Sequence, residues 1–226
     1  MFSYVIHNPN NLLINSDCHV IPFGHRCGTA LACKYANIRK FSLPFDWTNP
    51  ALPKKIQATL ENNFDNFIPN VHNGIFINKY GYDLSHFNQN INSGIEEYKR
   101  RIIRFNEIIN QTKKIYFIYF NEDYLYDNDY RKDEFNDKTF NDMLDLEQFI
   151  KNKYTNIDYK ILYFNFKRHN IPEDSNIMNI VLSSDNYYDS EHNAPYEDLR
   201  RYCGQILTEL FKTQLTTGYD NNTFND

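Results

Sequence analysis

The sequence predicts an α/β fold in which helices cover both faces of a mainly parallel sheet. Three mostly apolar runs, at residues 113–120, 159–166 and 177–184, have the length of strands that are buried on both faces. Segments with a helical spacing of apolar residues alternate with these runs along the chain. We see no internal repeat, and we expect a single three-layer domain over residues 1–226.

Each further element has its own local signal. An Asn-Pro-Asn-Asn turn separates two predicted strands at 2–6 and 11–14, and a third strand over 19–24 ends at Gly24. Apolar residues at helical spacing predict helices at 28–37, 49–68, 93–110, 139–153 and 194–213. Between these elements we expect an extended segment at 41–47, a strand with a loop or a hairpin at 73–87, and a loop at 121–138.

Charge and composition argue against several classes of protein. The net charge of −5 is unlike that of a general nucleic-acid binder, which carries a basic excess. No apolar run reaches the roughly 18 residues that a membrane span needs, and the N-terminal residues lack the pattern of a signal peptide. The four cysteines show no paired spacing, which favours reduced thiols and a cytoplasmic protein.

The stretch around Cys27 has the features of a reactive cysteine. Cys27 precedes the predicted helix at 28–37, and a thiolate is stabilised at a helix N-terminus or beside a cation such as Arg26. Gly24 and Gly28 allow a sharp turn and the close approach of a substrate, which His25 and Arg26 would contact. The alternative is that Cys27 is a small, inert residue buried under the helix.

The same region resembles a known family. The segments "IPFGHRC", "ALACKYANIRKFSLPFDW" and "IEEYKRRIIRF" are similar to a family of papain-like cysteine peptidases found in large DNA viruses and bacteria. The resemblance covers roughly residues 18–120. It implies that Cys27 is the nucleophile of a hydrolase acting on a peptide or small-molecule substrate, with Asp46 and Trp47 in the family signature. It also implies a papain-like α+β fold as the alternative, and the host cytoplasm if the protein is viral.

The partner of the cysteine is left open by the sequence. The family places a histidine after the short apolar strand of its second segment, where this chain has Asn78, with His86 further on. Asp189 and His192 form a D-x-x-H spacing before the last helix, which is similar to the ending of SGNH-type esterases. We therefore predict a Cys27–His192–Asp189 triad, with His86 or His25 as other bases. A solvent-exposed loop histidine is the competing interpretation of His192.

A metal site is not expected. The chain has no C-x-x-C or H-E-x-x-H motif, and the closely spaced Cys18, His19, His25 and Cys27 would point in alternate directions along a strand. We predict no cofactor.

A basic run on the predicted helix at 93–110 offers a second function. Arg100, Arg101 and Arg104 could clamp a carboxylate or phosphate, which suggests a transferase or binding protein for a phosphate-bearing ligand such as a nucleotide-sugar, in glycan assembly. The competing interpretation is a solvated helix face. Asp46 is predicted either to contact substrate or to be buried in an ion pair with Arg39, Arg100 or Arg101. A non-catalytic scaffold protein is the third possibility.

Overall fold

The computed structural model describes residues 2–7, 18–68, 77–84, 91–111, 114–122, 132–184 and 194–211. In this part of the chain the strands form one sheet in the order β1-β5-β4-β3-β2. Their bounds are β1 Phe2–His7, β2 His19–Pro22, β3 Lys114–Phe120, β4 Asp158–Asn165 and β5 Ile177–Ser184. β2, β3, β4 and β5 run parallel to one another, whereas β1 pairs antiparallel with β5. The prediction of an α/β fold is confirmed, a mainly parallel sheet is confirmed in part because of β1, and a papain-like fold is not confirmed.

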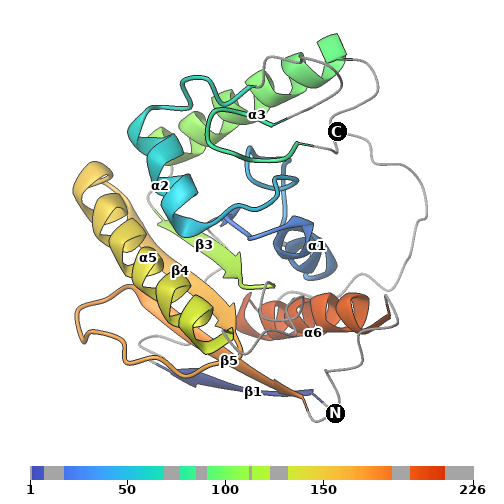
Figure 1. Ribbon diagram of the computed structural model, residues 1–226, viewed down its shortest axis with the longest axis vertical. Coiled ribbons are helices and arrows are strands. Elements are labelled where there is room, and N and C mark those ends of the chain that lie inside the picture. Colours follow the sequence, from blue (N-terminus) through green and yellow to red (C-terminus); the bar gives the residue numbers. More distant parts are fainter. Residues whose placement is uncertain are drawn as a thin grey trace.

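Helices lie against both faces of the sheet. Their bounds are α1 Cys27–Tyr35, α2 Pro53–Glu61, α3 Ile91–Gln111, α5 Lys132–Lys153 and α6 Ala194–Phe211. Figure 1 shows α5 on one side of the sheet, with α6 and α1 on the other. The alternation of side chains along β3 serves both layers, because Phe117 and Tyr119 pack toward α5 while Ile118 and Phe120 pack toward α1 and α6.

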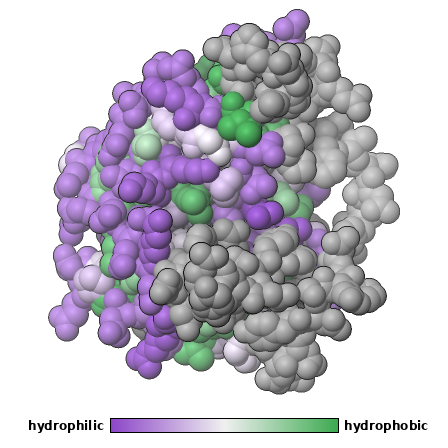
Figure 2. Space-filling model, viewed as in Figure 1, coloured by the Kyte–Doolittle hydropathy of each residue, from purple (hydrophilic) through white to green (hydrophobic). Residues whose placement is uncertain are grey.

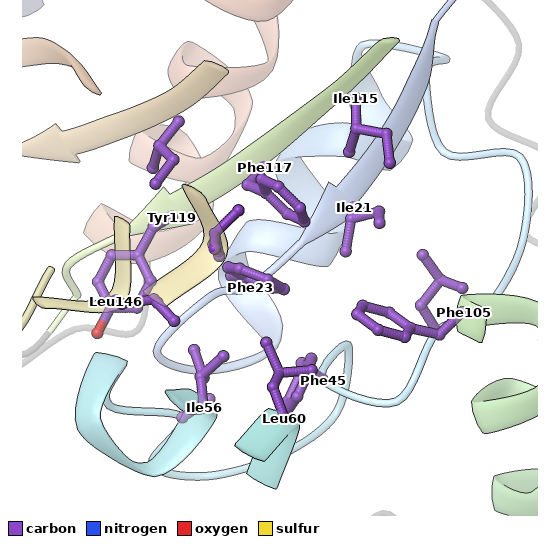
Figure 3. Close-up of a cluster of buried hydrophobic side chains, with 14 of the residues drawn as sticks. Ile21, Phe23, Phe45, Ile56, Leu60, Phe105, Ile115, Phe117, Tyr119 and Leu146 are labelled. Atoms are coloured by element: carbon purple, nitrogen blue, oxygen red, sulfur yellow. The ribbon is translucent and has the colours of Figure 1, made fainter. Parts of the chain in front are cut away.

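The larger of the two cores lies on the α5 side and is rich in aromatic rings. Phe23, which follows β2, stacks on Phe117 at 4.4 Å between ring centroids and meets the edge of Phe45 at 5.6 Å. Figure 3 shows these rings together with Leu60 of α2 and Phe105 of α3. The segment between α1 and α2 is thereby held against the sheet, which fixes the residues on either side of Cys27.

Among the predicted helices, the largest differences from the structure are at α2 and α5. The helix predicted over 49–68 spans only Pro53–Glu61. It begins after Leu52, whose backbone is extended (ψ 147°), and it ends before Asn63, Phe64 and Asn66, whose positive φ angles of 50°, 62° and 55° a helix cannot contain. Phe64 nevertheless remains buried in the core. The loop predicted over 121–138 is helical from Lys132 onward, where polar residues gave no apolar periodicity to detect.

The described residues in Figure 2 present a mainly hydrophilic surface, with scattered apolar residues. Large apolar side chains that are more than half exposed are few among the described residues and include Val5, Ile77 and Ile103. In the same part of the chain, no helix has the length and hydrophobicity to cross a bilayer.

Candidate functional site

Cys27 is the first residue of α1, which follows the carboxyl end of β2 after a four-residue turn, 23–26. The ladder between β2 and β3 continues one residue into this turn, because the backbone N–H of Phe23 donates to the Ile118 carbonyl at 2.8 Å. Gly24 is required there, since a methyl group on it would overlap the Thr29 hydroxyl. That hydroxyl accepts a hydrogen bond of 3.2 Å from the Phe120 N–H, which docks the first turn of α1 on the end of β3.

Glu122 reaches the same place from the end of β3. Because β2 and β3 are adjacent and parallel, their carboxyl ends meet at one edge of the sheet, where ligands commonly bind in α/β folds. Asn121 N–H donates to the Phe164 carbonyl at 2.9 Å, and Glu122 N–H donates back to the Phe120 carbonyl at 3.1 Å. This tight turn directs the Glu122 side chain toward α1.

The Glu122 carboxylate lies directly over Gly28 and is paired with Arg200 of α6. Arg200 Nε donates to Glu122 Oε1 at 3.0 Å and Nη2 donates to Oε2 at 3.1 Å, a two-pronged geometry. The side chains are 1% exposed for Glu122 and 15% for Arg200. A methyl group on Gly28 would overlap Oε1 and would lie 2.8 Å from Arg200 Nε. The residue next to Cys27 must therefore be glycine for the pair to form.

Cys27 is the least buried of the four cysteines, since Cys18, Cys33 and Cys203 are all buried. Burial raises the pKa of the Cys27 thiol; Arg200 opposes the rise and Glu122 adds to it. Arg26 opposes it more weakly, together with the backbone N–H of Cys27 itself. The net direction is opposite to the lowered pKa predicted from the helix start, because the loss of hydration outweighs the nearby positive charges.

His25 and Arg26 flank the cysteine in different ways. The His25 side chain is fully buried, and its backbone carbonyl accepts a hydrogen bond of 2.8 Å from the N–H of Ala51. Arg26 is half-buried at the N-cap position of α1 and makes no side-chain cap hydrogen bond. Their contact with a substrate stays a prediction.

Asp46 is held in a buried ion pair with Arg39. Arg39 donates to Asp46 Oδ2 through Nε at 2.8 Å and through Nη2 at 2.6 Å, and the Leu43 N–H donates to the same oxygen at 3.1 Å. Burial nevertheless raises the pKa of Asp46. The Arg39 guanidinium also lies over the Trp47 ring at 5.7 Å. The structure thus shows the predicted buried ion pair between Asp46 and Arg39, and substrate contact by Asp46 stays a prediction.

The three arginines of α3 do not point to a common place. Arg101 is buried and pairs with Glu97 one turn earlier, whereas Arg100 is exposed. Arg104 donates to the Ser42 carbonyl at 3.5 Å. The phosphate-ligand alternative gains no support from this arrangement.

Several predicted residues lie outside the described part of the chain. They are the triad members His192 and Asp189 and the alternative base His86. Asn78, where the resemblance predicts a histidine, is buried and donates to the Phe67 carbonyl at 2.7 Å, so it closes a loop. In the described ranges, no three histidine, cysteine or acidic side chains are grouped so as to hold a metal ion.

Comparison with known proteins finds a family match over the segment that contains Cys27. Residues 18–74 match the model of a family described as putative papain-like cysteine peptidase. The predicted resemblance is thus confirmed over β2, α1, the Asp46 loop and α2. The match does not extend to β3 or α6, which supply Glu122 and Arg200. No curated protein and no solved structure matches the chain.

Glu122 and Arg200 were missed by the sequence analysis. Glu122 carried a usable signal, because it comes two residues after an apolar strand and so had to lie at the carboxyl edge of a parallel sheet. Arg200 carried none, since charged residues are common on the exposed face of a terminal helix.

Proposed function

We propose that this protein is a cysteine-nucleophile hydrolase that acts on an acyl or isopeptide carbonyl. The observation that carries the proposal is the position of Cys27: a partly exposed thiol on the first residue of a helix, at the carboxyl edge of a parallel sheet. The match of residues 18–74 to a cysteine peptidase family supports the same residue as the nucleophile. A peptide or a small acyl compound is the substrate class, and the cytoplasm is the proposed compartment.

The chemistry follows from the state of the thiol. Because burial raises the pKa of Cys27, the thiol carries its proton at neutral pH and a base must accept that proton during attack. The Cys27 sulfur then bonds to the carbonyl carbon, and the leaving amine or alcohol takes the proton from the base. Water hydrolyses the resulting thioester and restores the thiol. His192, oriented by Asp189, is the proposed base, with His86 and His25 as alternatives.

The proposal can be tested by trapping the acyl-enzyme. The full chain is incubated with a set of activated acyl esters and with a peptide aldehyde, then quenched in acid and examined by intact mass and peptide mapping. We expect an adduct on Cys27 alone, because the other cysteines are buried. Cys27→Ala should abolish the adduct, and Cys18→Ala should leave it unchanged. An adduct that survives Cys27→Ala, or no adduct from any probe, would refute the proposal.

The base is identified by the pH dependence of acylation. His192→Ala should slow acylation at neutral pH by about 10²-fold or more, the usual contribution of a positioned base. The same change at His86 or at His25 gives the comparison. If only one of those two variants is slow, that residue takes the role proposed for His192.

A further inference from the structure

The Glu122–Arg200 pair is a built part of the site rather than a surface ion pair. It joins two segments that are 78 residues apart, and both prongs have hydrogen-bond distances. Glu122 is almost fully buried, and burying a carboxylate is costly unless it is paired and hydrogen-bonded. Apolar residues of similar volume often replace a buried ion pair without loss of stability, so holding α6 against the end of β3 does not by itself require these charges.

The location of the pair supplies a reason for the charges. Arg200 Nε and Glu122 Oε1 both lie against Gly28, the residue that follows Cys27. Cys27 is also the most exposed of the four thiols. The charged groups that act on Cys27 from the surrounding elements are Arg26 in the preceding turn, Glu122 after β3 and Arg200 on α6. Two of these three form the pair.

We propose that Arg200 is the residue that favours ionisation of the Cys27 thiol, and that Glu122 is the positioning residue that holds the Arg200 guanidinium beside it. The inference deepens the proposed hydrolase function and rests on it for its catalytic meaning. Among the influences that favour the thiolate, Arg200 is the strongest, and Glu122 acts in the opposite direction. The carboxylate therefore fixes the guanidinium at the cost of weakening its effect on the sulfur.

Arg200 and Glu122 act in opposite directions on the ionisation of the Cys27 thiol, so variants of the two residues should give opposite results. The rate of alkylation of Cys27 by iodoacetamide is measured against pH in the full chain, with each cysteine followed by peptide mapping. Arg200→Met should move the alkylation midpoint to higher pH, and Glu122→Gln should move it to lower pH, because the amide keeps an acceptor for Arg200 Nε without the charge. At a fixed pH below the midpoint, each variant should change the rate by about threefold, since nucleophilicity partly offsets the change in thiolate fraction.

The chain offers a matched control on the same helix. Arg201→Met removes the same charge one residue further along α6, where Arg201 pairs with Glu197 and lies over the Tyr35 ring at 4.9 Å. This variant should leave the alkylation midpoint unchanged. Arg200→Lys keeps the charge and should restore part of the shift. If Arg200→Met fails to fold, the double variant Arg200→Met/Glu122→Gln avoids a buried unpaired carboxylate, and its midpoint should lie above that of Glu122→Gln alone.

The outcomes separate this inference from the proposed function. Equal midpoints for Arg200→Met and Arg201→Met, or shifts in the same direction for Arg200→Met and Glu122→Gln, would overturn it in favour of a packing role. If the double variant Arg200→Met/Glu122→Gln is used, an alkylation midpoint equal to that of Glu122→Gln alone would also overturn the inference. Since alkylation needs no substrate, the expected shifts support the inference even if no acyl-enzyme forms. An acyl adduct on Cys27 without these shifts would keep the hydrolase and discard the role of Arg200.

Discussion

Replacing Gly28 by alanine tests the geometry of the site directly. The added methyl group would overlap Glu122 Oε1 and approach Arg200 Nε to 2.8 Å, so the carboxylate must move and the two-pronged bond must open. Opening a buried ion pair costs about 3 kcal/mol at the lower end of the usual range, which suits a pair whose arginine is partly exposed. Alanine in place of glycine stabilises a helix by up to about 1 kcal/mol. The net expectation is a loss of about 2 kcal/mol.

The same substitution should change sign when the carboxylate is absent. A Glu122→Ala background removes the two atoms nearest to the added methyl group and leaves Arg200 Nε on a flexible side chain, so the gain in helix propensity remains. Gly28→Ala should then stabilise the chain by up to about 1 kcal/mol. The double-mutant cycle therefore predicts a coupling energy of about 3 kcal/mol between positions 28 and 122.

Urea unfolding provides the measurement. Trp47 is the single tryptophan and is half-buried, so its fluorescence can follow the transition, with circular dichroism as the second probe. In a chain of this length the loss in Gly28→Ala corresponds to a fall in Tm of about 4–8 °C. If Gly28→Ala costs the same with and without Glu122, the carboxylate does not lie over Gly28 and the reasoning about the site is refuted.

Three further outcomes follow from buried groups elsewhere. Burial raises the pKa of Tyr159 to about 12 from 10.0, so the unfolded chain releases the tyrosine proton at a lower pH than the folded chain does. The resulting stabilisation is present below pH 10 and should be lost toward pH 12. Denaturant titrations measure it, and a free energy of unfolding that stays flat over this pH range would contradict it. Burial lowers the pKa of His169 below 6.5, so its contribution to stability is present above pH 6.5 and falls as the pH drops. His169→Phe keeps an aromatic ring stacked on Phe140, as the imidazole is at 4.1 Å, and should reduce this loss of stability in acid. If the acid sensitivity is unchanged in the variant, other groups cause the loss. Asp46→Asn should lower the free energy of unfolding by about 3 kcal/mol, because Arg39 loses a buried charged partner. The acylation rate of Cys27 should stay the same, and slower acylation would favour the predicted role of Asp46 at the substrate.

The fold was predictable where a single element carries its own pattern. The strand over 177–184 has the predicted bounds, and the last helix begins at the predicted Ala194, because long apolar runs and regular spacing are local properties of the sequence. β1 illustrates the limit. Its strand character was predicted, but its antiparallel pairing with β5 depends on contacts between the two ends of the chain that no local pattern encodes.

The candidate site also contains residues that a local pattern predicts and residues that only the packing of distant segments brings together. Cys27 at a helix start follows from the glycine turn and the periodicity after it, and the structure places it there. Glu122 and Arg200 come from two other segments, and only the packing of β3 and α6 brings them to Gly28. The direction of the Cys27 pKa could not be predicted for the same reason, since it depends on how deeply these segments bury the sulfur.

The raised pKa of Cys27 changes what an active site here requires. A thiol ionised at rest by its helix and its arginines would react without help, whereas a thiol kept neutral by burial reacts only when a base removes its proton. In the proposed site, burial limits the thiolate in the resting protein, and the Glu122–Arg200 pair keeps a cation in place for the moment of attack. A partly buried thiol that keeps its proton therefore calls for a base, and His192 is the base proposed here. The acylation pH profiles of Arg200→Met and Glu122→Gln, compared with that of His192→Ala, link the Glu122–Arg200 pair to catalysis, because the shifts in midpoint found by alkylation should recur there if the same thiol is acylated.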